Sequence, residues 1–265
     1  MLTKLSKFKR HGGFTGDIIV REDCSVLYIA VPKVANSSLK SAFLAPHVGR
    51  LPPEMQSELG DSERRFSPLT NPRLRDYFAK SGALVHRNEV IERYAGFQRI
   101  AFVRDPFERL VSCWRDKIRP SDQNGRSFEG GVHRGFLRFG KRFWGGMPLS
   151  EFVMAVSTIP DEDANPHFKS QTSFLRDDHG RWLPTWLGSM EALGNNVEQL
   201  NAAFPDLALA IEQKNATGKV DAASHTLDDF CRRQILTRYA EDVALIDTLR
   251  RHENSDLHNE NAMTS

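Results

Sequence analysis

Two short apolar runs stand out along the chain, and each passes through a polar turn into a helical pattern. The runs cover residues 26–31 and 99–103. The first run is continuously apolar and rich in β-formers, which predicts a strand covered on both faces, as in a parallel sheet. The second is apolar after Arg99 and predicts another strand. The first turn leads into a predicted helix over residues 37–44, which Asn36 or Ser37 can cap.

The second turn carries a complete set of helix-start signals. Asp105 suits the N-cap, Pro106 the first helical position and Glu108 the third, which resembles a capping box. Apolar residues at helical spacing then predict a helix to about residue 118. The remaining patterns predict strands at 82–85 and 181–187 and helices at 89–94, 149–157, 197–204 and 227–249, with 168–174 ambiguous. Strands alternating with helices indicate an α/β fold, with an open parallel sheet of the P-loop-like type flanked by helices.

The connection at residues 119–148 differs in character from the rest of the chain. It combines many glycines and prolines with basic and aromatic residues, and loops of this length in compact domains commonly have a function. We expect a long loop with a little local helix, on the side of the sheet where an acceptor would bind. Its basic and aromatic residues are Arg126, Arg134, Arg138, Lys141, Arg142, Phe128, Phe136, Phe139, Phe143 and Trp144.

Bulk properties fit one globular unit. With 265 residues and a formal net charge of +2, the chain offers no basic excess that would point to a nucleic-acid partner. No apolar run approaches the roughly 18 residues of a membrane span, and the basic N-terminus has no apolar segment after it. We expect a single domain over residues 1–250, a disordered tail over 251–265 and a surface excursion at 51–73.

Cysteine usage favours a reducing compartment. The three cysteines are scattered and show no metal-ligand or redox spacing: Cys24, Cys113 and Cys231. The expectation is therefore a soluble, cytoplasmic protein without a metal site, whose basic N-terminal segment could at most touch an anionic membrane surface. The oligomeric state is left open by the sequence.

The first turn has the elements of a phosphate-binding site without the usual glycines. A Walker loop reads G-x-x-x-x-G-K-[ST], whereas here Lys33 opens the turn and no glycine follows it. Small residues and two hydroxyls still precede the helix, whose N-terminal amides favour anions. The turn lacks the partners that hold magnesium in ATP enzymes. It is formed by Pro32, Lys33, Val34, Ala35, Asn36, Ser37 and Ser38.

The second turn offers a complementary anion site. Arg104 ends its predicted strand and can direct two hydrogen bonds at a phosphate. Ser112 lies two helical turns later and could meet the same anion. The alternative is a strand-end ion pair of Arg104 with Asp105 or Glu108.

These two segments resemble the nucleotide-binding motifs of the Golgi carbohydrate sulfotransferases. Residues 32–38 resemble their 5′-phosphosulfate loop, and residues 102–112 resemble their 3′-phosphate motif almost letter for letter. The group that sulfates chondroitin and dermatan is the nearest in pattern, and the heparan uronyl 2-O-sulfotransferases are more distant. Weaker similarities follow in the family's order, at residues 165–171, 187–193, 215–217 and 239–242. Because the chain shows neither the membrane anchor nor the disulfides of Golgi members, it resembles a soluble member of the family.

The resemblance implies a reaction and a donor. The donor would be 3′-phosphoadenosine 5′-phosphosulfate (PAPS), and the sulfuryl group would move in line to a carbohydrate or glycoconjugate hydroxyl. Lys33 would stabilise the leaving phosphate, the backbone and hydroxyls of residues 34–38 would hold the 5′-phosphate, and Arg104 with Ser112 would hold the 3′-phosphate. A late loop would close over the nucleotide with Asn215, Thr217 and Lys219.

The resemblance also suggests the base. His86 follows a predicted strand where related enzymes place a catalytic histidine, and a neutral imidazole suits deprotonation of a hydroxyl. His167 is the rival, with acceptor contact or packing as its other roles. His133 and His179 show no ligand spacing.

Other interpretations of the chain stay open. One is a P-loop kinase or other nucleotide hydrolase, and another is a non-catalytic protein that binds anionic glycans on the same scaffold. Trp182 and Trp186 could stack on a sugar, although core packing is the simpler role. The basic-aromatic loop at 119–148 could hold an anionic glycan or be ordinary solvated surface.

Overall fold

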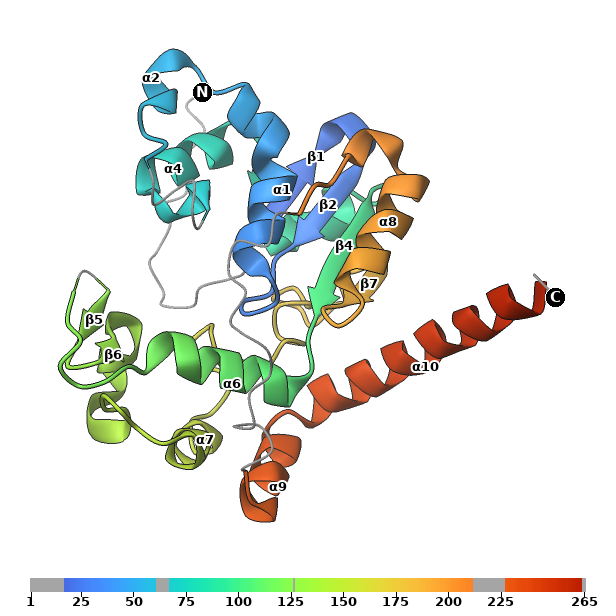
Figure 1. Cartoon of the computed structure of the whole chain (residues 1–265). Helices are drawn as coiled ribbons and strands as arrows, with labels where there is room; N and C mark the ends of the chain where they lie inside the picture. Colours follow the sequence, from blue (N-terminus) through green and yellow to red (C-terminus); the bar gives the residue numbers. More distant parts are fainter. Residues whose placement is uncertain (1–16, 61–66, 126, 212–226, 264–265) are drawn as a thin grey trace.

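A five-stranded sheet forms the centre of the computed structural model, which describes residues 17–60, 67–125, 127–211 and 227–263 (Figure 1). The strand order is β3-β1-β2-β4-β7. The strands are β1 (Ile18–Arg21), β2 (Val26–Ile29), β3 (Leu84–Val85), β4 (Gln98–Val103) and β7 (Trp186–Ser189), and a separate hairpin pairs β5 (Phe128–Glu129) with β6 (Val132–His133).

The sheet is open, is flanked by helices and contains parallel pairs, which confirms the predicted α/β class, and one of its strands, β1, runs antiparallel to its neighbours. β2 pairs parallel with β4, and β4 pairs parallel with β7. β1, which the sequence patterns did not indicate, is antiparallel to both β2 and β3. The connection between β1 and β2 is a short turn ending at Ser25 with φ of 56°, without the Asn-Gly or Asp-Gly pair that marks most tight hairpins.

Helices pack around this sheet, and in Figure 1 α1 and α8 lie on the viewer's side of it. The α-helices are α1 (Asn36–Gly49), α2 (Pro53–Gln56), α4 (Pro72–Lys80), α5 (Val90–Arg93), α6 (Pro106–Lys117), α7 (Leu149–Ser157), α8 (Leu193–Ala203), α9 (Asp229–Arg238) and α10 (Ala240–Met263). Single 3₁₀ turns are η1 (Glu22–Cys24), η2 (Pro68–Thr70), η3 (Arg87–Glu89) and η5 (Pro205–Leu207), and the longer η4 covers Arg134–Arg142. None of these described helices has both the length and the apolar character needed to cross a membrane.

The apolar interior has two parts. One surrounds the sheet and includes a stacked pair, Tyr28 and Phe43, whose ring centroids lie 4.5 Å apart. The other lies between α6, α7, α9 and the connection after α6, with Phe136 and Phe168 at its centre. Because α6 contributes its buried face to the second part, the helix links the sheet edge to the lower part of the molecule in Figure 1.

Two predicted elements differ in detail from the structure. The helix expected at 227–249 is two helices that meet at Tyr239, and α10 continues to Met263. The connection at 119–148 contains the β5–β6 hairpin and η4 in place of a largely irregular loop. Its aromatic residues explain the order: Phe136 and Phe143 are buried in the second apolar cluster.

Candidate active site

The parallel strands bring the predicted phosphate-binding segments to one edge of the sheet. In register, Val85 of β3, Ile18 of β1, Ile29 of β2 and Ala101 of β4 lie in one row across the sheet. The carboxyl ends of β3, β2, β4 and β7 therefore share an edge, which is where open α/β sheets bind ligands. The turn with Lys33 follows β2, Arg104 follows β4 and His86 follows β3.

The turn after β2 has an unusual backbone. Lys33 and Ala35 adopt left-handed conformations, with φ of 70° and 41°, which non-glycine residues rarely do. Such outliers cluster at ligand sites. Ala35 is the N-cap of α1 and supplies no side-chain cap, so the first amides of α1 remain available to an anion. Among the described residues, the buried Asn36 Oδ1 has no hydrogen-bond partner.

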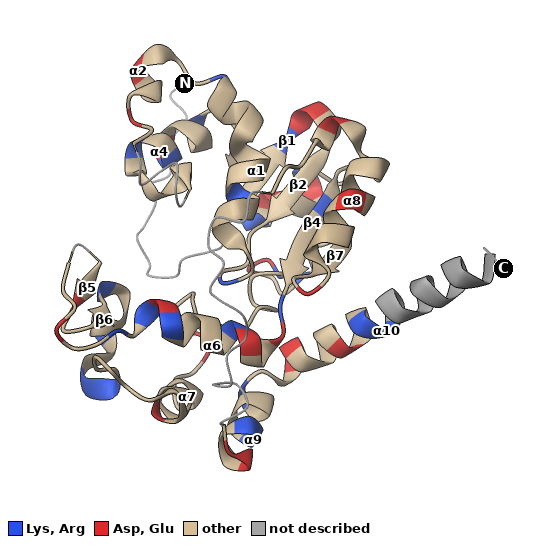
Figure 2. Cartoon of the chain, viewed as in Figure 1, with Lys and Arg blue, Asp and Glu red and all other residues tan. Residues whose placement is uncertain are grey.

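Lys33 lies in a small charged cluster at the end of α6. Its Nζ donates to Asp116 Oδ2 at 2.9 Å, and Lys117 Nζ lies 3.1 Å from the same oxygen. Figure 2 shows basic and acidic residues together at this end of α6, which faces the β5–β6 hairpin. Burial alone would raise the pKa of Asp116, but Lys33 and Lys117 hold it well below its usual range. Burial also lowers the pKa of Lys117.

Arg104 is fixed through its backbone while its guanidinium stays weakly paired. Gln171 accepts from the Arg104 N–H at 2.9 Å and donates to the Arg104 carbonyl at 2.8 Å. The guanidinium lies 3.6 Å from the Glu108 carboxylate. This is the ion pair expected as the alternative to anion binding, at a distance longer than that of a hydrogen bond. Burial lowers the pKa of Arg104 even though Glu108 opposes it. An incoming anion would offset that cost of burial.

Ser112 is buried on α6, and the hydrogen bonds of the described residues do not join it to Arg104. The helix begins as predicted, because Asp105 Oδ1 accepts from the amides of Phe107 and Glu108.

Arg109 organises the site although the sequence patterns did not single it out. Its guanidinium donates to the carbonyls of Pro32 at 2.9 Å, Lys169 at 2.8 Å and Pro166 at 3.3 Å. It thereby ties the Lys33 turn to residues 165–171. A signal was present, because Arg109 and Lys117 fall on the buried stripe of α6 that Leu110 and Cys113 also occupy.

The junction of α9 and α10 supports residues 165–171 as well. Tyr239 donates its hydroxyl to the Phe168 carbonyl at 2.6 Å. Asp242 accepts from the amides of Gln171 and Thr172 at 2.8 and 2.9 Å, and burial raises its pKa. Residues 165–171 and 239–242, the two segments with weak similarity to the family, therefore contact each other.

The three histidines near this edge have different surroundings. His86 caps η3, and its Nδ1 accepts from the Asn88 amide at 3.3 Å. His167 lies next to His133, with ring centroids 5.7 Å apart. Burial, with the charges of Lys117 and Lys33 next, lowers the pKa of His167 well below its ordinary value. The structure thus groups His167 and His133 with the Lys33 cluster.

One predicted group of residues falls in a part of the chain that the structure does not describe, and a predicted pair of tryptophans is separated. Asn215, Thr217 and Lys219 lie outside the described residues. Trp182 is not in β7, so it does not share a strand face with Trp186, which packs edge-on against Phe102 at 5.4 Å.

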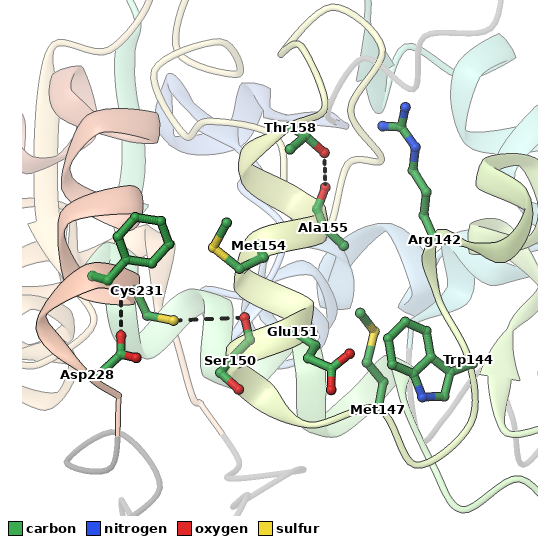
Figure 3. Close-up of a pocket in the computed structure, with 11 residues that line it drawn as sticks. Arg142, Trp144, Met147, Ser150, Glu151, Met154, Ala155, Thr158, Asp228 and Cys231 are labelled. Atoms are coloured by element: carbon green, nitrogen blue, oxygen red, sulfur yellow. Dashed lines mark hydrogen bonds between the residues drawn. The ribbon is translucent and has the colours of Figure 1, made fainter.

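A cavity of about 630 Å³ lies between α7 and α9, and no residue of the Lys33 cluster lines it (Figure 3). Met147 and Met154 line it together with Cys231 and the half-exposed Trp144. Within Figure 3, Cys231 Sγ points to the Ser150 carbonyl. Residues of the 119–148 connection and of α9 both line the cavity. None of the residues that line it belongs to the two phosphate-binding motifs.

One of the comparisons with known proteins identifies a family. No curated protein and no solved structure matches the chain. A family model described as "Sulfotransferase family" matches residues 16–246, which is most of the chain and includes both turns and α6. Membership implies PAPS as donor and sulfuryl transfer as the reaction. The chain belongs to the sulfotransferase family.

Proposed function

We propose that this protein transfers the sulfuryl group of PAPS to a hydroxyl of a carbohydrate or glycoconjugate. The observation that carries the proposal is the pairing of two anion sites at one sheet edge, after the adjacent parallel strands β2 and β4. Arg109 links the first of them to residues 165–171, and Gln171 links that segment to Arg104. Two separate anion sites at one edge suit a donor that carries phosphate groups on both the 3′ and the 5′ position of its ribose.

Each part of the site has a role in this proposal. The α1 amides and the hydroxyls of Ser37 and Ser38 hold the 5′-phosphosulfate, and Arg104 with Ser112 binds the 3′-phosphate. Lys33 leaves Asp116 to stabilise the charge that grows on the leaving phosphate. The acceptor oxygen forms a bond to sulfur as the bridging oxygen–sulfur bond breaks, and a histidine takes the hydroxyl proton.

A carbohydrate acceptor is supported by the likeness of residues 32–38 and 102–112 to the chondroitin and dermatan sulfotransferases. In the connection at 119–148, the exposed Trp144 beside Arg142 offers a surface for a sugar ring, whereas Phe136 and Phe143 are buried and unable to stack on one.

Transfer of labelled sulfate from PAPS to a panel of glycans tests the proposal. We expect the wild type to label at least one glycan, and Lys33→Ala to lower kcat by about 100-fold or more, as loss of one charge-stabilising donor does. Lys80→Ala is the matched control, because Lys80 is an exposed lysine on α4 paired with Asp76. Equal rates for wild type and Lys33→Ala, or labelling of peptides or small phenols with no glycan labelled, would contradict the proposal.

A further inference from the structure

We infer that Asn165 is a positioning residue that fixes the tautomer of His167, so that His167 Nε2 is the atom that accepts the acceptor's proton. The inference rests on the proposed function and names the base within the same site. It follows from the hydrogen-bond partners of three histidines, since the partner of one ring nitrogen decides which nitrogen carries the proton.

The orientation of the Asn165 amide is fixed by groups that have only one hydrogen-bonding role. Its Nδ2 donates to the Gly135 carbonyl at 3.1 Å, and its Oδ1 accepts from the backbone N–H of His167 at 3.1 Å. A carbonyl only accepts and a backbone amide only donates, so the amide cannot be turned over without losing both bonds.

This orientation determines the state of the His167 ring. Asn165 Oδ1 lies 2.7 Å from His167 Nδ1, and an amide oxygen can only accept, so Nδ1 must carry the proton. The neutral ring then has an unprotonated Nε2. Burial keeps the ring neutral at pH 7, because it lowers the pKa of His167 well below the ordinary value.

The other two histidines have the opposite tautomer. His86 Nδ1 accepts from the Asn88 amide at 3.3 Å, and His133 Nδ1 accepts from the Gly135 amide at 3.1 Å. In each neutral ring the proton is therefore on Nε2. In these two histidines Nε2 is a hydrogen-bond donor and cannot take up a proton. Among these three histidines, only His167 has an unprotonated Nε2 in its neutral ring.

The position of His167 suits the reaction. The charged and titratable groups that act on its ring are Lys33, Lys117, His133 and Asp116. Arg109 binds the carbonyls of Pro32 and Pro166, the residues directly before Lys33 and His167, and so holds these two side chains on neighbouring segments. As the acceptor oxygen bonds to sulfur, its proton moves to His167 Nε2, and the bond to the 5′-phosphate breaks with its electron pair on the phosphate oxygen beside Lys33. The imidazolium then keeps its Nδ1 hydrogen bond to Asn165.

Imidazole nitrogen NMR on the ¹⁵N-labelled full chain tests the tautomers without any turnover. Variants His86→Gln, His133→Gln and His167→Gln assign the signals. We expect the proton on Nδ1 in His167 and on Nε2 in His86 and His133 at neutral pH. A His167 ring protonated on Nε2 would overturn the inference.

Turnover tests the role of Asn165. Asn165→Ala should lower kcat by about 10- to 100-fold, as loss of an orienting partner does, with KM for PAPS unchanged. Asn165→Asp should restore kcat and move the acidic limb of its pH profile to higher pH, because a carboxylate raises the pKa of the ring. His179→Gln, at a surface position outside the site, is the control.

Two outcomes separate this inference from the proposed function. If the wild type transfers sulfate but His167→Gln keeps the wild-type kcat, the inference fails and the function stands. If the wild type transfers no sulfate to any glycan, the proposed function fails, and with it the role given to His167 Nε2, while the NMR result still shows whether Asn165 fixes the tautomer.

Discussion

His133 is neutral in the folded protein at a pH where an exposed histidine is largely charged. Burial, followed by the charge of Lys117, lowers its pKa from the ordinary 6.5 to about 4. Between these values the unfolded chain binds a proton that the folded chain does not. The contribution of His133 to the free energy of unfolding is therefore fully present above pH 6.5 and is lost as the pH falls towards 4.

The prediction is that the free energy of unfolding of the wild type decreases from pH 7 to pH 4.5, and that His133→Gln reduces this decrease. Denaturant unfolding at the two pH values measures it, with His179→Gln as the surface control. A variant with the same pH dependence as the wild type would show that His133 is not held neutral by the fold.

Two tyrosines give a matched test of one hydrogen bond. Both hydroxyls are buried, but Tyr239 donates to the Phe168 carbonyl, whereas Tyr28 finds no partner among the described residues. Tyr239→Phe should lower the free energy of unfolding by about 1 kcal/mol. Tyr28→Phe should leave it unchanged or raise it, because the substitution removes an unsatisfied buried hydroxyl. The reverse order in urea unfolding would contradict these assignments.

At the scale of elements, the sequence predicts best where hydrophobic periodicity and helix capping agree. The strands at 26–31 and 99–103 and the helix opened by Asp105 are present close to the predicted bounds. The antiparallel β1 was missed because its turn lacks the usual hairpin residues. The break at Tyr239 was missed because the apolar pattern continues through it, and its contact with the distant Phe168 carbonyl cannot be seen in the sequence.

The candidate site was predictable only where a local motif identifies its residues. Local motifs identified Lys33 and Arg104, which the structure places at one sheet edge. The link that Arg109 makes to three backbone carbonyls is a tertiary property that no local pattern contains. The same holds for the tautomers of the histidines, since each depends on which partner the fold brings to one ring nitrogen.

Arg109→Lys tests the link between α6 and the two loops. A lysine keeps the charge but cannot reach three carbonyls from one planar group, so the free energy of unfolding should fall by about 3 kcal/mol, as when a buried charge loses its partners. Affinity for adenosine 3′,5′-bisphosphate should weaken as well, because the Lys33 turn loses its support. Arg134→Lys, at an exposed ion pair, should change neither quantity, and a stable Arg109→Lys variant with full affinity would refute the link.

At the scale of the whole molecule, we propose that the sheet edge, α6 and the junction of α9 and α10 together bind a nucleotide with two separate phosphates. In this proposal the turn with Lys33 assists the bond change, and Arg104 recognises the donor. The two sites depend on each other through Arg109 and Gln171. This dependence predicts selectivity for nucleotides that carry a 3′-phosphate.

The most direct measurement of the central claim is thermal unfolding of the full chain with adenosine 3′,5′-bisphosphate, with ADP and with ATP plus magnesium. At a concentration near 100 times Kd, the bisphosphate should stabilise the protein by about 2.7 kcal/mol, which corresponds to a rise in Tm of roughly 5 °C. ADP, which lacks the 3′-phosphate, and ATP with magnesium should raise Tm much less, and Arg104→Ala should remove the difference. Stabilisation by ATP with magnesium and not by the bisphosphate would contradict a PAPS-dependent sulfotransferase.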